Sequence, residues 1–474
     1  MKRTILVLAG IALATAACSS NVQPDETTAE ATEPSTSGAT APTDSTTTLV
    51  ALPPITSEVD SATMVIVGGT VLTMNPNQPT AEAVAVRGAS IVAVGSELDI
   101  ADFVNDKTQV IDLAGRTLLP GFVDGHVHYF SNSDGTPSYL QAIQDDILSS
   151  GVTTVAEMSV TRQGLAELRQ LDDDGLLRVR TSVYVGHNTV CGEAVDSWLG
   201  EIEPTREWGE SLRIGGIKIF NDGGACNVPA SSYEKQNGGM GDLYMTADEL
   251  AAVVSVYDKA GFQVAIHALG DRAIEATLDG LAQVITDGNP LRHRIEHNAS
   301  VRPDLRSRYD EVGAVAMTFG SFPTCVMTGN DDRFQFTIDA EYQEWEWPWR
   351  DLIDQNPNTV FAWHGDYPVF TDSTPIANLA GYVTRVQILP DGTVCEPEPY
   401  HAKHAITVEE ALAMMTMGSA YALDRETEVG SIEVDKLADF VVLSGNPTKV
   451  EPMDLFDLKV EMTVFNGEIV FGDV

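Results

Sequence analysis

Eight short apolar runs, each stopping at a polar residue, restrict the fold of this chain more than any other feature. They lie between residues 122 and 366, mostly at intervals of roughly 30 residues, which is the length of one βαβ unit. The polar residues at or just after their ends are His126, Glu157, His187, Lys218, His267, His297, Thr318 and Asp366. Helical patterns lie between the runs, for example over 247–260 and 271–287. This alternation predicts a (β/α)8 TIM-like barrel, whose chemistry sits at the C-terminal strand ends.

Short β segments lie on both sides of the barrel region. Those between 64 and 119 are separated by Gly68-Gly69, Arg87-Gly88 and Gly95, which we interpret as hairpin turns. Those between 439 and 471 include an Asn-Gly turn at 466–467, a strong hairpin signal. We therefore expect 62–119 and 430–474 to form one small β-sandwich domain from both chain ends, with the barrel over 120–429.

The N-terminus has the layout of a targeting signal. Lys2 and Arg3 precede an apolar stretch that ends at Ala17, directly before Cys18. This resembles a bacterial lipobox, so we expect 1–18 to be a lipoprotein signal peptide with Cys18 lipidated. Residues 19–60 then form a Thr-rich disordered linker. The protein would be an extracytoplasmic lipoprotein anchored to a membrane. An ordinary cleaved signal peptide, giving a secreted or periplasmic protein, is the alternative.

Composition excludes several classes of partner. The chain carries 28 Lys and Arg against 69 Asp and Glu, a formal net charge of -41. Such a surface repels phosphate backbones, so we expect a small-molecule substrate and no nucleic acid. Membrane contact is expected only through the N-terminal lipid, and a homo-oligomer stays open. The four cysteines after Cys18 form no CxxC pair, so a cysteine zinc site is not expected and their disulfide pairing stays open.

The histidines carry the expected chemistry. His126 and His128 form an H-x-H pair, and alternate residues of a strand share a face, so both imidazoles can point at one ion. His267, His297 and Asp366 end three further runs. Imidazole and carboxylate ligands suit zinc and related metals, so these strand ends predict a metal centre. Four histidines are expected not to be ligands, and His364 is undecided; the four are His187, His293, His401 and His404.

Four segments resemble a known family. They are 119–128 (LPGFVDGHVH), 264–274 (VAIHALGDRAI), 293–297 (HRIEH) and 430–440 (GSIEVDKLADF). Together they are similar to the metal-dependent amidohydrolase superfamily, amidohydrolase-3 (YtcJ-like) branch, over roughly 62–474. Two departures concern the substrate region. The spacing from His128 to the next strand is short, and 221–226 (NDGGAC) lacks the usual Gly-Ser-Arg.

The resemblance implies residue roles. His126, His128 and Asp366 would hold one Zn2+, His267 and His297 a second, and a carboxylated Lys218 would bridge them. A metal-activated hydroxide would hydrolyse a non-peptide C–N bond of a small molecule, with Asp366 transferring the proton. Hydrolysis of a lactone or ester, and a non-catalytic surface-anchored binding protein, remain alternatives. For Lys218, the alternative is a plain lysine that pairs with Asp222 or with a substrate carboxylate.

Overall fold

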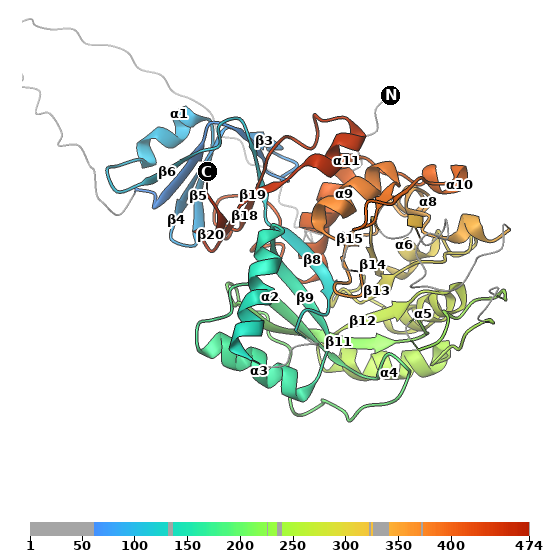
Figure 1. Ribbon diagram of the computed structural model, residues 1–474. Helices are drawn as coiled ribbons and strands as arrows, with labels where there is room; N and C mark the ends of the chain where they lie inside the picture. Colours follow the sequence, from blue (N-terminus) through green and yellow to red (C-terminus); the bar gives the residue numbers. More distant parts are fainter. Residues whose placement is uncertain are drawn as a thin grey trace, which may run out of the picture. The chain divides into compact units, whose positions relative to one another are not determined.

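Eight parallel strands form the centre of the protein, at the positions of the apolar runs (Figure 1). Each strand pairs with its neighbour in sequence, in the order β8 to β15. The backbone joins the last strand region to the first, because Asp366 N donates to His126 O (3.0 Å) and His128 N to Tyr367 O (2.7 Å). This confirms the predicted barrel. Its strands are β8 (Phe122–Val127), β9 (Val152–Val160), β10 (Arg180–Gly186), β11 (Leu212–Phe220), β12 (Gln263–Ala268), β13 (Arg294–His297), β14 (Val315–Thr318) and β15 (Phe361–Trp363).

This computed structural model describes residues 61–130, 136–224, 226–234, 239–321, 324–325, 341–370 and 373–473. The expected signal peptide with Cys18 and the linker over 19–60 lie outside this part of the chain. Within it, no helix has both the length and the apolar character needed to cross a membrane. Residues from 61 onward belong to one compact unit, so the domain boundaries at 119/120 and 429/430 stay a prediction.

Helices follow the barrel strands and cover them from outside. The helix α4 begins after Thr246, whose hydroxyl caps Glu249 N while the Glu249 carboxylate caps Thr246 N in return. The two helices predicted at 247–260 and 271–287 end one and three residues earlier than expected, as α4 and α5. The main helices are α2 (Pro137–Ser149), α3 (Arg162–Asp173), α4 (Ala247–Lys259), α5 (Asp271–Val284), α6 (Arg308–Val312), α8 (Trp349–Gln355), α9 (Pro375–Thr384) and α11 (Val408–Ala413).

Two further sheets combine strands from both ends of the chain. One has the order β5-β4-β1-β6 and the other β20-β19-β18-β7-β2-β3. Apolar side chains of both sheets share one buried core, including Ile66 and Val84 of the first and Phe440 and Val464 of the second. This confirms the predicted sandwich. The strands are β1 (Met64–Val67), β2 (Thr70–Leu72), β3 (Thr80–Ala81), β4 (Ala83–Arg87), β5 (Ser90–Gly95), β6 (Gln109–Asp112), β7 (Thr117–Pro120), β18 (Phe440–Leu443), β19 (Val460–Phe465) and β20 (Glu468–Gly472).

The hairpin predicted at Gly68-Gly69 is wrong. Strand β1 pairs with β4 and β6, whereas β2 pairs with β3 and β7, so the two glycines carry the chain from one sheet to the other. Gly68 has φ +74°, and a Cβ at Gly69 would lie 2.4 Å from Arg116 O. Glycine is therefore required here for a left-handed residue and a close backbone crossing.

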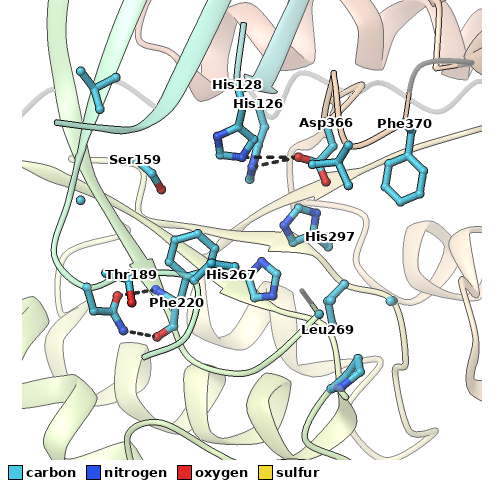
Figure 2. A pocket seen from close by; sticks show the side chains of 18 of the residues that line it. His126, His128, Ser159, Thr189, Phe220, His267, Leu269, His297, Asp366 and Phe370 are labelled. Carbon is cyan, nitrogen blue, oxygen red and sulfur yellow. Dashed lines mark hydrogen bonds and ion pairs between the residues drawn. The ribbon is translucent and has the colours of Figure 1, made fainter. Parts of the chain in front are cut away.

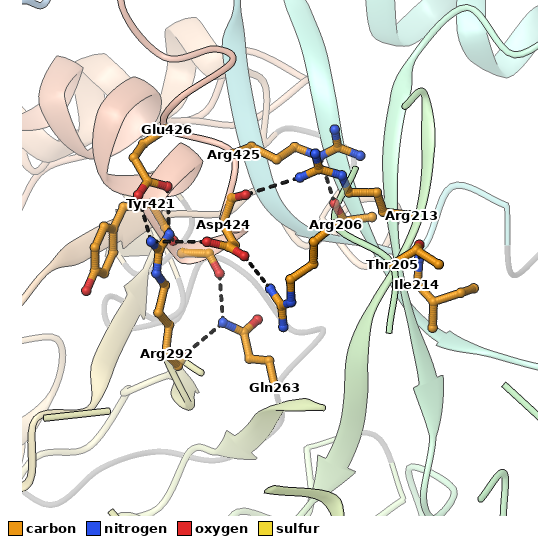
Figure 3. A network of polar contacts seen from close by, with 12 residues as sticks. Thr205, Arg206, Arg213, Ile214, Gln263, Arg292, Tyr421, Asp424, Arg425 and Glu426 are labelled. Carbon is orange, nitrogen blue, oxygen red and sulfur yellow. Dashed lines mark hydrogen bonds and ion pairs between the residues drawn. The ribbon is translucent and has the colours of Figure 1, made fainter. Parts of the chain in front are cut away.

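A network of arginines closes the barrel at the start of its strands (Figure 3). Arg213 of β11 donates to Asp424 O (3.1 Å), and Arg425 donates to Ser182 Oγ of β10 (3.1 Å). Arg292, just before β13, forms an ion pair with Glu426 (2.6 Å). The segment around 424–426 is thus fixed to three barrel strands. The C-terminal ends of the barrel strands, at the other end of the barrel, carry the polar residues predicted from the sequence.

We expect Val464→Asp to destabilise the protein strongly. The Val464 side chain is fully buried between the two sheets, so a carboxylate there loses its hydration without gaining a partner. The expected loss is about 3 kcal/mol, or a fall in Tm of roughly 5 °C or more, measured by thermal unfolding. Val434 is 50% exposed, so Val434→Asp is the matched control and should leave Tm unchanged. Equal Tm values for the two variants would contradict the shared core.

Candidate active site

The residues at the ends of β8 and β15 converge in the mouth of the barrel (Figure 2). His126 Nε2 lies 3.5 Å and His128 Nε2 lies 3.6 Å from Asp366 Oδ1. The three residues each offer a ligand atom within 4.8 Å of the others. Ligands at about 2.1 Å from a zinc ion are themselves roughly 3.4 Å apart, so this spacing suits one ion.

Two more predicted ligands lie beside this group. The ring centroid of His297 is 4.8 Å from that of His126 and 4.6 Å from that of His267. Lys218 is fully buried, and its Nζ lies 3.5 Å from His126 Nε2. All six site residues predicted from the sequence, apart from Cys18, therefore lie at one end of the barrel. Figure 2 shows the four imidazoles and Asp366 facing the same cavity.

Burial keeps the imidazoles in the neutral form that a metal ion requires. It lowers the pKa of His128 to about 4 and that of His267 to about 3, and holds the pKa values of His126 and His297 well below the usual range. The positive charge of Lys218 lowers the pKa of all four rings further. Buried neutral imidazoles next to a carboxylate fit a divalent cation, because it replaces the solvation that these groups lose.

The pKa values of Lys218 and Asp366 shift in opposite directions. Burial lowers the pKa of the Lys218 ammonium, which favours the neutral amine. Burial also raises the pKa of the Asp366 carboxyl, which makes this group a stronger base than an exposed aspartate.

Two of the predicted ligands, His297 and Asp366, have a strained backbone. His297 has φ +71° and Asp366 has φ +53°, in the left-handed region that costs a residue with a Cβ about 1–3 kcal/mol. The buried Asp124 carboxylate supports the turn that carries Asp366, because it accepts hydrogen bonds from Gly365 N (2.9 Å) and His126 N (3.3 Å). Asp124 thereby joins the two strand ends that carry His126 and Asp366. Burial raises its pKa to about 8.

Glu296, which was not among the residues predicted from the sequence, contacts the predicted ligand His126. Its Oε2 lies 2.5 Å from His126 Nδ1, and its Oε1 lies 3.0 Å from Arg294 Nε, with all three side chains buried. A carboxylate on one ring nitrogen directs the other nitrogen, here Nε2, toward the metal position. The available signal was an acidic residue directly before His297 in the segment 293–297 (HRIEH).

The remaining histidines divide into two groups. His187 bonds the Tyr257 hydroxyl (3.1 Å), and His293 pairs with Asp258 (3.0 Å), which gives both a structural role. His401 contacts Arg385, and His404 Nδ1 lies 3.9 Å from Asp351 Oδ1, so neither belongs to the group of predicted ligands. His364, which the sequence left undecided, is buried beside the ligands, with its ring 4.8 Å from that of His297.

A cavity of about 660 Å³ opens onto the ligands and is lined by residues from the loops after the barrel strands. The loop between β11 and α4 contributes Gly224 and Pro229 to its wall. A disulfide between Cys191 and Cys226 ties this loop to the one after β10. A second disulfide joins Cys325 and Cys395, so the open question of cysteine pairing is answered.

We expect Glu296→Gln to lower the affinity for Zn2+ about 10- to 100-fold, because a neutral amide orients His126 less strongly than a carboxylate. The measurement is a zinc titration against a competing chelator. Glu311 is exposed on α6, and Glu311→Gln is the matched control, with unchanged affinity expected. Unchanged zinc affinity in Glu296→Gln would show that this carboxylate does not position the ligand.

Known proteins resemble both the sequence and the fold. Putative amidohydrolase YtcJ of Bacillus subtilis is 27% identical over 60% of this chain and 52% of its own length. Protein LONG AFTER FAR-RED 3 of Arabidopsis thaliana is 27% identical over 63% of this chain and 51% of its own length. The chain thus spans about half the length of these relatives. N-substituted formamide deformylase of Arthrobacter pascens is 25% identical over 70% of this chain and 60% of its own length.

The structure of an uncharacterized metal-dependent hydrolase from Pyrococcus horikoshii has the same fold. It superposes with a TM-score of 0.67 at 19% identity, covering 82% of this chain and 99% of that one. The model of the amidohydrolase family (Amidohydro_3) matches residues 132–471. This confirms the resemblance seen in the four sequence segments: the chain belongs to the amidohydrolase family.

Proposed function

We propose that this protein hydrolyses a non-peptide C–N bond of a small molecule at a centre of two zinc ions. The observation that carries the proposal is the convergence of four neutral imidazoles, Asp366 and Lys218 at one end of the barrel. The relative named N-substituted formamide deformylase supports a small-molecule C–N substrate.

His126, His128 and Asp366 would hold one ion, and His267 and His297 the other. A protonated Lys218 between them would be repelled by both cations, whereas carboxylation of Nζ reverses its charge and supplies two oxygens. The lowered pKa of Lys218 supports this, because only a neutral amine reacts with carbon dioxide. The alternative pairing with Asp222 has little support, since that carboxylate accepts bonds from Gly270 N (2.8 Å) and Ala230 N (3.0 Å) and thus holds loops.

Two zinc ions there would polarise the amide carbonyl and lower the pKa of the attacking water. Asp366 lines the cavity, and its raised pKa suits a general base that accepts a proton and returns it to the leaving amine nitrogen. Glu296 and Asp124 would keep the ligands in place during this transfer. The apolar cavity wall would limit the access of bulk water.

We also propose that the protein works outside the cytoplasm, attached to a membrane through lipidated Cys18. The two disulfides support this location, because such bonds persist in oxidising compartments. The net charge of -41 supports the absence of a nucleic-acid partner.

The bridging role predicts that Lys218→Ala drops the metal content from two ions per chain to one or none. Amide hydrolysis should fall more than about 100-fold, because the metal centre supplies several kcal/mol of the rate enhancement. Metal analysis and amide turnover are measured on the same samples. Lys259 is exposed at the end of α4, so Lys259→Ala is the control and should keep both ions and full turnover.

Retention of two ions by Lys218→Ala would contradict the bridge. Cleavage of esters but of no amide by the metal-loaded wild-type protein would contradict the substrate class. Cleavage of neither would favour the alternative that the protein binds a ligand without catalysis.

The lipid anchor predicts that Cys18→Ser moves the protein from the membrane fraction to the soluble fraction without loss of activity. Cell fractionation and mass spectrometry of the mature N-terminus check this. Ser19→Ala, next to the modified residue, is the control and should stay with the membrane. A mature N-terminus at a residue other than Cys18 would contradict the lipoprotein assignment.

A further inference from the structure

The wall of the cavity around the predicted ligands is mainly apolar. Apart from the predicted ligands, the lining consists mainly of apolar and aromatic side chains, some of which touch the ligand rings, as Phe220 does at His267 (ring centroids 5.1 Å apart). Figure 2 shows Phe220, Leu269 and Phe370 around the ligand group. Val195 and Trp198 extend this surface toward the loop after β10. A cavity of about 660 Å³ has room for a substrate with a bulky group, and this wall favours an apolar one.

Arg162 is the one lysine or arginine among the described residues that line the cavity. Its guanidinium already has two acceptors. Nε and Nη2 each lie 2.7 Å from a carboxylate oxygen of Glu201, and Nη2 also donates to Ser197 O (2.9 Å). The guanidinium lies over the Trp198 ring, 4.5 Å from its centroid. Glu201 therefore compensates the charge of Arg162 and occupies its Nε and Nη2 donors.

A substrate carboxylate would meet no uncompensated side-chain cation among these described residues outside the metal centre. Bidentate binding by arginine is the usual way in which proteins recognise a carboxylate, and Glu201 occupies that fork. Desolvation of an anion against an apolar wall is costly without such a partner. The acidic surface of the whole protein also repels anionic molecules during their approach.

From these contacts we propose that the substrate is an uncharged amide with a bulky apolar substituent, and that the Arg162–Glu201 pair discriminates against carboxylates. This substrate class rests on the proposed amide hydrolysis and makes it more specific. N-acylated amines with an aromatic or branched alkyl group belong to the class, whereas N-acylated amino acids do not.

Two substrates that differ only in a carboxylate test the proposal. They are N-formyl-2-phenylethylamine and N-formyl-L-phenylalanine, each assayed with the zinc-loaded full chain, together with their acetyl counterparts. We expect kcat/KM to be at least about 100-fold higher for the uncharged member of each pair, the size of effect that an unpaired buried charge produces. Equal values, or a preference for the carboxylates, would overturn the substrate class while leaving amide hydrolysis intact. If no member is cleaved, the proposed function fails as well.

Two variants test the cavity wall directly. Val195 lines the cavity and is 39% exposed, so Val195→Asp keeps the fold and should lower kcat/KM for N-formyl-2-phenylethylamine about tenfold or more. Val256 is 49% exposed on α4 and lies outside the cavity lining, so Val256→Asp is the control, with unchanged kinetics expected. Unchanged kinetics in Val195→Asp would contradict an apolar substrate site.

Removing the charge of Glu201 tests the second half of the proposal. Glu201→Gln leaves the Arg162 charge uncompensated, so the preference for the uncharged substrate should fall at least about fivefold. Glu167 lies on α3, the helix of Arg162, and accepts a hydrogen bond from Gln163 rather than from Arg162. Glu167→Gln is therefore the control and should keep the full preference. An unchanged preference in Glu201→Gln would show that this ion pair does not discriminate against carboxylates.

Discussion

The active end of the barrel depends on one electrostatic conflict, a buried lysine among buried imidazoles. Lys218 is inaccessible to solvent, and its charge lowers the pKa of four histidines that burial already keeps neutral. Such a cluster lacks the solvation that each polar group has in water, and it is costly without a compensating ligand. Divalent cations and a carboxylated Lys218 would reverse this balance, since every imidazole and carboxylate would then have a partner.

The rest of the structure holds these groups in place. Asp124 joins the strand ends of β8 and β15, and Glu296 fixes the ring of His126. Asp124 thereby supports the turn in which Asp366 adopts a positive φ that free chains rarely adopt. At the opposite end, the arginine network of Figure 3 fixes the segment around 424–426 to the starts of three strands. Stability and chemistry are thereby separated between the two ends of the barrel, as in other barrels of this type.

The sequence was sufficient for the barrel and for the grouping of its ligands, because strands of a closed parallel barrel place their last residues at one end. It was insufficient where a contact depends on three-dimensional neighbours. Gly68-Gly69 looks like a hairpin turn, yet it links two sheets, and nothing local distinguishes these outcomes. Glu296 and Asp124 gain their roles from other strands. The cysteine pairs required the fold, because four cysteines allow three pairings.

The proposed chemistry depends on a pair of metal ions bridged by a modified Lys218. X-ray diffraction from crystals of the zinc-loaded protein, recorded at the zinc absorption edge, tests it most directly. We expect two anomalous peaks, one among His126, His128 and Asp366 and one beside His267 and His297, with electron density for a carboxylate group on Lys218 Nζ. A single peak with an unmodified Lys218 amine would contradict it.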